Sequence, residues 1–174
     1  RPSTRSRKKI GTRATMMIAI ANTTGRTTRA ALDSFRRHQL LHSLALTDEL
    51  CRVGEALDAN AIPFATFKGV TLASMLYGDA SMRESTDIDI LVPEAHVARA
   101  EGVLADRGYR SSQGDQGFRR MFLSSQRQYA LKRSDTGFAI DLHWAFTGRE
   151  LPFPLAPDEV WSRLDTVGMD AQEI

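Results

Sequence analysis

Residues Asp87–Val92 read DIDILV, and this stretch decides the fold class. Its β-branched and aliphatic residues are typical of a strand, in which successive side chains point to opposite faces. Asp87 and Asp89 therefore share one face, while Ile88 and Ile90 share the other, which we expect to lie against a core. The plainer alternative is an edge strand with a solvated acidic face, because D-x-D is a common tripeptide.

The two carboxylates of this strand suggest a cation site. Two such groups repel each other, and the repulsion raises the pKa of one of them unless a cation lies between them. Hard oxygen ligands suit Mg²⁺, with Mn²⁺ as the alternative ion. The pair of aspartates therefore predicts a divalent-metal site at Asp87 and Asp89.

A second strand is predicted at Phe138–Trp144, which reads FAIDLHW. Its apolar residues alternate, so Asp141 and His143 lie together on the opposite face. Asp141 is either an ordinary surface acid or a third metal ligand from a neighbouring strand. Three carboxylates on adjacent strands can hold two Mg²⁺ ions, which clamp the attacking and leaving oxygens of an in-line displacement. His143 either orients an acceptor or a phosphate, or donates a hydrogen bond to the acids.

A phosphate-binding turn is predicted at Phe67-Lys68-Gly69, between a short strand at residues 63–67 and a helix at residues 70–77. Glycine allows close backbone approach, a helix N-terminus offers N–H groups, and Lys68 can neutralise phosphate charge. A strand-to-helix turn that needs Gly69 only for its geometry is the alternative. Arg83, in the loop before the acidic strand, either stabilises charge on a leaving pyrophosphate or is solvated or paired with Glu84.

The remaining pattern places these strands in a mixed β-sheet flanked by helices, an α/β (α+β) fold with a helical N-terminal segment. Apolar residues at three- and four-residue steps predict a helix over 30–60. A second helix is expected from Pro93 to about Arg107, with Gly108 as its stop. We expect a hairpin that joins 128–133 to 138–144, a polar loop at 109–118, a connector at 151–156 and a short helix at 157–164.

Charge is divided unevenly along the chain. Residues 1–37 carry a net charge of +9 and the remainder −7, which gives the overall +2. We expect residues 1–28 to be a basic, disordered leader and residues 29–174 to be the folded domain. The leader could contact nucleic acid, although a solvated tail is the simpler interpretation. The chain has one cysteine and no apolar run long enough to cross a membrane, so we expect a cytoplasmic protein.

Taken in order, these motifs resemble the family of uncharacterised nucleotidyltransferases. The matching pieces are Phe67-Lys68-Gly69, Leu72, Leu76-Tyr77, Arg83, Asp87–Val92, Gly108-Tyr109 and Asp141–Trp144. The resemblance covers roughly residues 35–170 and extends to the polymerase-β-like nucleotidyltransferase superfamily. It implies a nucleotidyltransferase-like core with a two-metal site.

The resemblance also assigns roles to residues. Asp87 and Asp89 match the paired metal-binding acids, and Asp141 matches the third carboxylate, which in the superfamily can also help to deprotonate the acceptor hydroxyl. Lys68 and Gly69 stand where a Gly-Gly or Gly-Ser turn binds phosphate. The implied activity is Mg²⁺-dependent transfer of a nucleoside monophosphate from an NTP, such as ATP, to an acceptor hydroxyl, with release of pyrophosphate.

Two departures from the family pattern keep alternatives open. Val70 stands where the superfamily usually has serine, and Thr71 is a possible substitute. Family members tend to continue into a further C-terminal helical region after the position where this sequence stops. The acceptor could be a small molecule, a protein or peptide, or RNA. The alternatives to this activity are a catalytically inactive nucleotide- or partner-binding module and a toxin-type nucleotidyltransferase of a toxin–antitoxin pair.

Overall fold

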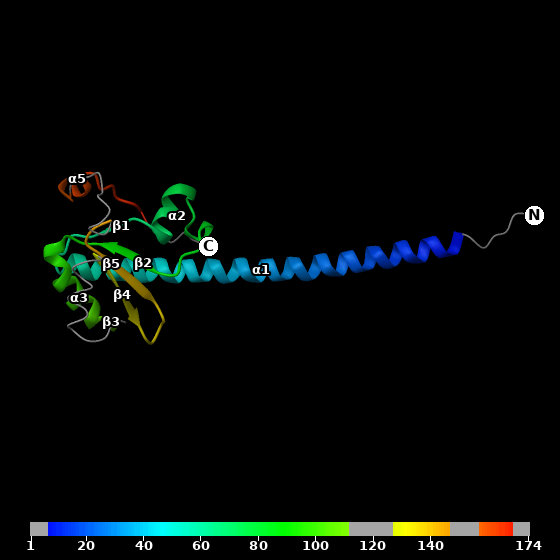
Figure 1. Cartoon of the computed structure of the whole chain (residues 1–174), viewed down its shortest axis with the longest axis horizontal. Coiled ribbons are helices and arrows are strands. Elements are labelled where there is room, and N and C mark those ends of the chain that lie inside the picture. The colour runs from blue at the N-terminus through cyan, green and yellow to red at the C-terminus, as the bar shows by residue number, and fades with distance from the viewer. Residues whose placement is uncertain (1–6, 112–126, 147–156, 169–174) are drawn as a thin grey trace, which may run out of the picture. The chain divides into compact units, whose positions relative to one another are not determined.

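The computed structural model describes residues 7–111, 127–146 and 157–168. These residues form a five-stranded mixed sheet and helices (Figure 1). The chain divides into two compact units, Arg1–Gln39 and Leu40–Ile174, and the sheet belongs to the second. The predicted fold class is confirmed. No helix within the described residues is long and apolar enough to cross a membrane.

Helix α1 runs from Arg7 to Ala59, so it begins earlier than the predicted start near residue 30. The sequence contains no proline between these residues, and proline is the residue that most strongly interrupts a helix. The helix therefore includes most of the segment for which the sequence predicts disorder. The division at residue 28 into a leader and a folded domain stays a prediction.

The end of α1 is fixed by backbone hydrogen bonds. The Ile62 amide donates to the carbonyl of Leu57 over 3.0 Å, and the Ala61 amide donates to that of Asp58 over 2.9 Å. Ala61 has a φ of 51°, so this end has the hydrogen bonds and left-handed residue of a Schellman motif. Ile62 and Leu57 are both buried, which adds the apolar contact that usually accompanies the motif.

The sheet has the strand order β1-β2-β5-β4-β3. Strand β2 (Ile88–Leu91) lies between β1 (Ala65–Thr66) and β5 (Ala139–His143), antiparallel to the first and parallel to the second. The edge-strand alternative for the acidic stretch is therefore wrong, because β2 has a partner on both sides. The predicted hairpin is confirmed by the antiparallel pair of β4 (Gln128–Arg133) and β5.

Strand β3 (Tyr109–Ser111) lies where the sequence predicts a polar loop. It pairs with β4, and Tyr109 is buried in the core. Three residues are too few for an alternating pattern to be visible in sequence, so the loop prediction was wrong at its start. The rest of that loop and the predicted connector at 151–156 lie outside the described residues.

The other helices are close to their predicted places. Helix α2 (Gly69–Tyr77) ends at Gly78, and α3 (Val97–Asp106) follows the 3₁₀ helix η2 (Glu94–His96). Another 3₁₀ helix, η1 (Ala80–Met82), lies in the predicted polar loop, and α5 (Pro157–Ser162) is the predicted short helix.

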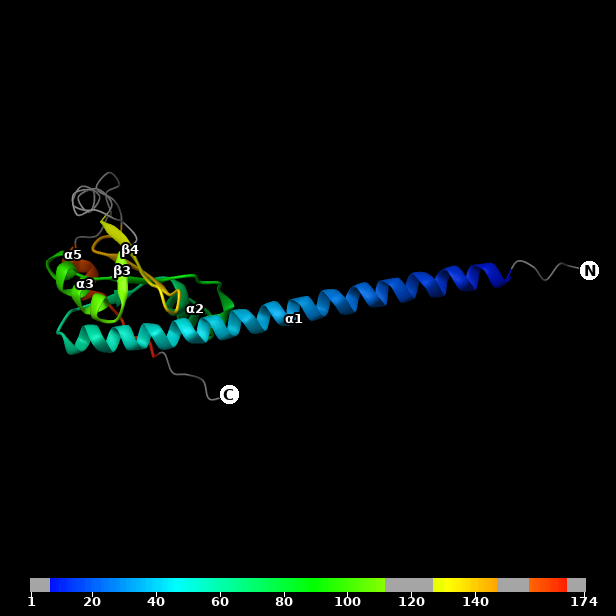
Figure 2. The same cartoon turned by 90° about the horizontal axis from the view of Figure 1, so that it is seen from below.

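The core lies between one face of the sheet and the helices α1 and α3 (Figure 2). Ile88 and Ile90 of β2 are fully or almost fully buried there, as the alternation predicted. The other face of β2 therefore carries the aspartates. The helices and strands contribute the buried residues Leu46, Leu50, Val53, Leu57, Ala100, Leu104, Leu131, Ile140 and Leu142.

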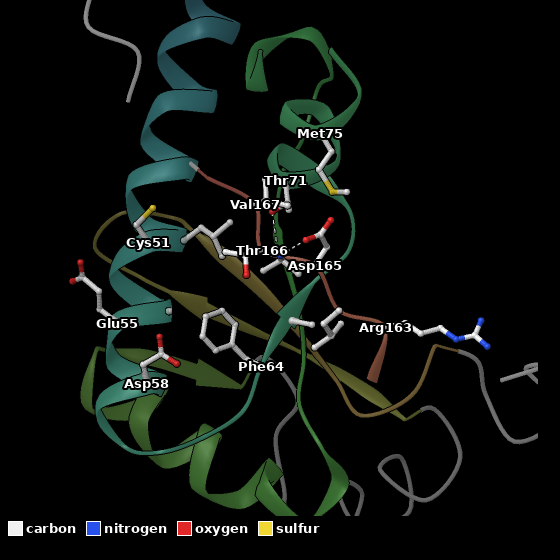
Figure 3. A pocket seen from close by; sticks show the side chains of 15 residues that line it. Cys51, Glu55, Asp58, Phe64, Thr71, Met75, Arg163, Asp165, Thr166 and Val167 are labelled. Atoms are coloured by element: carbon white, nitrogen blue, oxygen red, sulfur yellow. Dashed lines mark hydrogen bonds between the residues drawn. The ribbon is translucent and has the colours of Figure 1, made fainter. Parts of the chain in front are cut away.

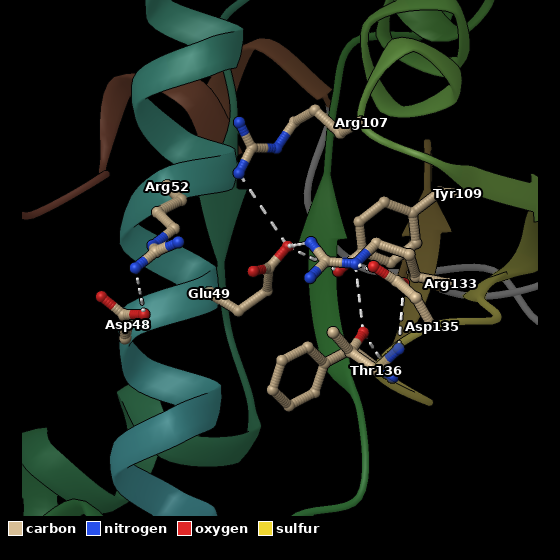
Figure 4. A network of polar contacts seen from close by, with 9 residues as sticks. Asp48, Glu49, Arg52, Arg107, Tyr109, Arg133, Asp135 and Thr136 are labelled. Atoms are coloured by element: carbon tan, nitrogen blue, oxygen red, sulfur yellow. Dashed lines mark hydrogen bonds and ion pairs between the residues drawn. The ribbon is translucent and has the colours of Figure 1, made fainter.

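A buried polar cluster joins α1 to strands β3 and β4 (Figure 4). Oε1 of Glu49 accepts hydrogen bonds from Arg133 Nη1 (2.7 Å) and from the hydroxyl of Tyr109 (3.0 Å). Arg107 Nη2 lies 4.0 Å from the same oxygen. Burial, followed by the charge and hydrogen bond of Glu49, raises the pKa of Tyr109, so this phenol stays protonated as a donor.

We predict that Glu49→Ala lowers the free energy of unfolding by about 2–3 kcal/mol, because it leaves the buried Tyr109 hydroxyl without its acceptor and removes the buried one of the two acids that pair with Arg133. Asp48→Ala is the matched control. Asp48 pairs with Arg52 on the same helix, but both side chains are more than half exposed, so the loss should stay below about 0.5 kcal/mol. Urea unfolding of both variants measures the difference, and equal losses would contradict the buried-pair interpretation.

Candidate active site

The acidic site is built by the parallel pairing of β2 with β5. In this register Asp89 lies directly beside Asp141, and Leu91 lies beside His143. Neighbouring residues of paired strands point to the same face, so the pairing brings together two carboxylates that are distant in sequence. One potential ligand atom from each of Asp89, Asp141 and His143 lies within 4.8 Å of the other two.

Asp89 is the centre of the polar contacts at this site. Its Oδ1 accepts a hydrogen bond from Lys68 Nζ over 2.9 Å, and His143 Nε2 lies 3.0 Å from the same oxygen. Burial works to raise the pKa of Asp89, but the hydrogen bonds and charges of His143 and Lys68 outweigh it and lower the pKa below its ordinary value. Asp89 is therefore a carboxylate at neutral pH.

Asp141 has the opposite electrostatic environment. Its pKa is raised, first by burial and next by the charge of Asp87, with a smaller contribution from Asp89. His143 and Lys68 offset only part of this effect. The structure thus holds uncompensated negative charge beside Asp141, which is the condition that a bound cation relieves.

Asp87 lies immediately before β2 and is half buried. It is not one of the three residues whose ligand atoms lie within 4.8 Å of each other. Its charge nevertheless contributes to the raised pKa of Asp141. The strand pairing therefore brings Asp89 and Asp141 together, and Asp87 acts on the same site from just outside β2.

The donor set fits a divalent cation. Asp89 and Asp141 supply neighbouring carboxylate oxygens, and the raised pKa of Asp141 reports charge repulsion that such an ion would remove. These two acids would hold it most directly, since they belong to the compact triad. Asp87 would add a third carboxylate from the residue just before β2.

The Lys68-Gly69 turn connects β1 to α2, as predicted. Gly69 has a φ of +56°, a conformation that residues with a side chain rarely adopt, and it begins the helix. Lys68 is the residue before the first helical turn, and its ammonium group lies 4.9 Å from the ring centre of Phe67. The turn thus brings a cation and a helix N-terminus next to Asp89.

Two other residues named from the sequence lie elsewhere. Arg83 is exposed after η1, and within the described residues no hydrogen bond or ion pair joins it to the three acids. Thr71 is buried, and its hydroxyl accepts a hydrogen bond from Thr66 over 2.9 Å. Thr71 is thus engaged with β1.

Thr66 and Thr71 also line a pocket of about 720 Å³ (Figure 3). The pocket lies between α1, β1, α2 and residues 163–167, and its other lining residues include Phe64 and Met75. None of the three aspartates lines it. This pocket is therefore separate from the acidic site.

The structure adds contacts that sequence reasoning missed. The ring of Phe67 packs edge-on against His143, with 5.1 Å between ring centres, and against Phe146 at 5.0 Å. His42 of α1 hydrogen-bonds through Nε2 to the carbonyl of Ser85, just before the acidic strand. An aromatic residue beside the Lys-Gly turn was a visible signal, whereas nothing local indicated that His42 reaches residue 85.

We predict that Asp141→Asn stabilises the protein in the presence of a chelator at neutral pH. A raised pKa means that ionised Asp141 opposes folding above its folded-state pKa, and this opposition disappears below the unfolded-state pKa. The gain in melting temperature should therefore be present at pH 7 and vanish as the pH falls through the carboxyl range. Thermal unfolding at several pH values checks this.

The exposed Asp33→Asn provides a control for that experiment, because it removes an acid that lies outside the acidic site. Its effect on melting temperature should not change with pH in the same way. A destabilising Asp141→Asn substitution at neutral pH would contradict the charge-repulsion account of the site.

Comparison with known proteins places these features in context. Residues 15–174 match the model of a family described as uncharacterised nucleotidyltransferase. The solved structure of the antibiotic-resistance factor ANT(2'')-Ia is similar at 16% sequence identity and a TM-score of 0.46. That match covers 63% of this chain and 55% of the other, so the chain spans about half of that protein's length. No curated protein matches the chain. Since the family model spans most of the sequence, the chain belongs to the uncharacterised nucleotidyltransferase family.

Proposed function

We propose that this protein transfers a nucleoside monophosphate from an NTP to an acceptor hydroxyl and releases pyrophosphate. Membership of a nucleotidyltransferase family supports nucleotidyl transfer in general. The single observation that carries the finer proposal is the register of β2 and β5, which sets Asp89 beside Asp141.

In this proposal Asp87, Asp89 and Asp141 hold Mg²⁺, or Mn²⁺ in its place. When bound, the metal neutralises triphosphate charge and makes the attacking oxygen a better nucleophile. The lowered pKa of Asp89 keeps that ligand ionised at neutral pH. Asp89 and Asp141 lie side by side, so a nucleotide bound there meets both acids together.

The phosphate end of the nucleotide is assigned to the turn before α2. Lys68 offers an ammonium group next to Asp89, and Gly69 allows the backbone to approach the phosphates. His143 completes the polar group around Asp89. We also propose that Arg83 binds the leaving pyrophosphate. This assignment is based only on the position of Arg83 before the acidic strand, because no contact with the acids is described for it.

The proposed reaction is an in-line displacement. The acceptor oxygen forms a bond to the α-phosphorus, and the bond from that phosphorus to the oxygen bridging to the β-phosphate breaks. Pyrophosphate leaves with this electron pair toward Lys68. The acceptor's proton passes to Asp141, as the family resemblance implies for the third carboxylate. Positioning and charge stabilisation supply most of the rate enhancement.

The acceptor, the nucleotide and the cellular location remain parts of the proposal. A small molecule, a protein or peptide, and RNA each present a hydroxyl that this chemistry could use. A cytoplasmic location fits the supply of NTP and Mg²⁺. Contact of the basic N-terminal segment with nucleic acid stays a prediction.

The first test incubates purified protein with each α-³²P-labelled NTP, Mg²⁺ and a lysate of the source cell. We expect a labelled product with wild-type protein, and a rate at least about 100-fold lower with Asp89→Asn, because that variant loses a charged metal ligand. Asp48→Asn, an exposed acid on α1, is the control and should keep the activity.

Two results would contradict this assignment. Full activity of Asp89→Asn would remove the acids from the mechanism. Absence of label with every nucleotide, together with thermal stabilisation by ATP in Mg²⁺, would favour the inactive nucleotide-binding module.

A further prediction distinguishes a role of the Gly69 backbone in phosphate binding from the strain that any side chain would cause at its positive φ. Gly69 and Gly78 lie at opposite ends of α2 with φ values of +56° and +69°. Substitution of either glycine by alanine should lower the free energy of unfolding by about 1 kcal/mol, because the alanine would have to adopt a left-handed backbone conformation. Only Gly69→Ala should also weaken Mg²⁺-dependent binding of ATP, by roughly tenfold, as measured by calorimetry. Equal ATP affinities of the two variants would argue against a phosphate site at this turn.

A further inference from the structure

His143 has a role at the acidic site that its position in the sequence leaves open. The residue lies on β5, two positions after Asp141, and the parallel register places it beside Leu91. Its side chain is only 3% exposed. A histidine this close to two carboxylates is either a direct metal ligand or a hydrogen-bond donor that positions one of them.

The contact between His143 and Asp89 decides between these roles. His143 Nε2 lies 3.0 Å from Asp89 Oδ1, which is a hydrogen-bond distance, and since a carboxylate oxygen accepts, this nitrogen carries the hydrogen and donates it. Nε2 therefore has no lone pair to offer to a metal ion, and coordination by this imidazole would require Nδ1.

The two partners of Asp89 Oδ1 differ in how firmly they are held. The Lys68 side chain is 46% exposed and flexible, so its bond can exchange for one to a phosphate. His143 is enclosed, its backbone belongs to an interior strand, and the ring of Phe67 packs against it. His143 is thus the lasting partner of this oxygen.

We propose that His143 is a positioning residue that fixes the Asp89 carboxylate through Nε2–H and leaves the other carboxylate oxygen, Oδ2, available to a divalent cation, without being a metal ligand itself. This inference rests on the proposed function, because it concerns the same metal site. The ring of Phe67, the residue after β1, packs edge-on against the imidazole and supports its orientation.

The experiment uses Mn²⁺ as the probe and the full chain without nucleotide, so that it does not depend on activity. Affinity is measured by calorimetry, and electron spin-echo modulation of bound Mn²⁺ reports whether a nitrogen is coordinated directly. The variants are His143→Leu, which fills similar space without a donor, and His143→Gln, whose amide can donate from a comparable position. Circular dichroism and melting temperature verify that each variant is folded.

We expect wild-type protein to bind Mn²⁺ without a directly coordinated nitrogen. His143→Leu should weaken binding by about 10-fold or more, the usual effect of losing a partner that orients a ligand. His143→Gln should recover most of that loss. If His143 had a purely structural role, His143→Gln would restore Mn²⁺ affinity only as far as it restores the melting temperature.

Three outcomes would overturn the inference, and they separate it from the proposed function. A directly coordinated nitrogen that disappears in His143→Leu makes His143 a ligand. Unchanged affinity of folded His143→Leu, while Asp89→Asn loses Mn²⁺, removes the positioning role but keeps the metal site. Absence of Mn²⁺ binding by wild-type protein, or equal binding by Asp89→Asn, removes the metal site and with it both proposals.

Discussion

The parallel pairing of β2 with β5 is the constraint on which the site depends. Its register joins Asp89 to Asp141 across more than fifty residues of sequence, and the same ladder carries His143 to Asp89. A shift of one residue would turn these side chains into the core and turn Ile140 and Leu142 out of it. The apolar core against α1 and α3 therefore fixes the register, and through it the geometry of the acids.

The electrostatics of the site follow from this arrangement. Asp89 and Asp141 are neighbours with opposite pKa shifts, since Lys68 and His143 both contact Asp89 while Asp141 faces the charges of Asp87 and Asp89. Lys68 and His143 thus compensate the charge of Asp89, whereas the charge beside Asp141 is the repulsion that a bound cation would relieve.

The surrounding structure supports the site from several directions. Helix α1 contributes core residues, the Glu49 cluster with Arg133 and Tyr109, and the hydrogen bond from His42 to the segment before β2. The Gly69 turn begins α2 next to Asp89, and the Phe67 ring lies against His143. The pocket between α1, β1, α2 and residues 163–167 is lined by none of the three aspartates, so it is a separate feature of the surface.

The sequence by itself determined what depends on local pattern. Alternation correctly predicted that Ile88 and Ile90 face the core, because the side-chain period of a strand is two. The same pattern placed Asp89, and Asp141 with His143, away from those core positions, and the structure gathers these three side chains. The hairpin, the Gly78 end of α2 and the family also followed from short motifs. Tertiary structure alone decided the β2–β5 pairing, the three-residue strand β3, and the contacts of Lys68 and His143 with one oxygen of Asp89. Each of these joins residues that are far apart in sequence or too few for a pattern, and only the packing of the whole core selects them.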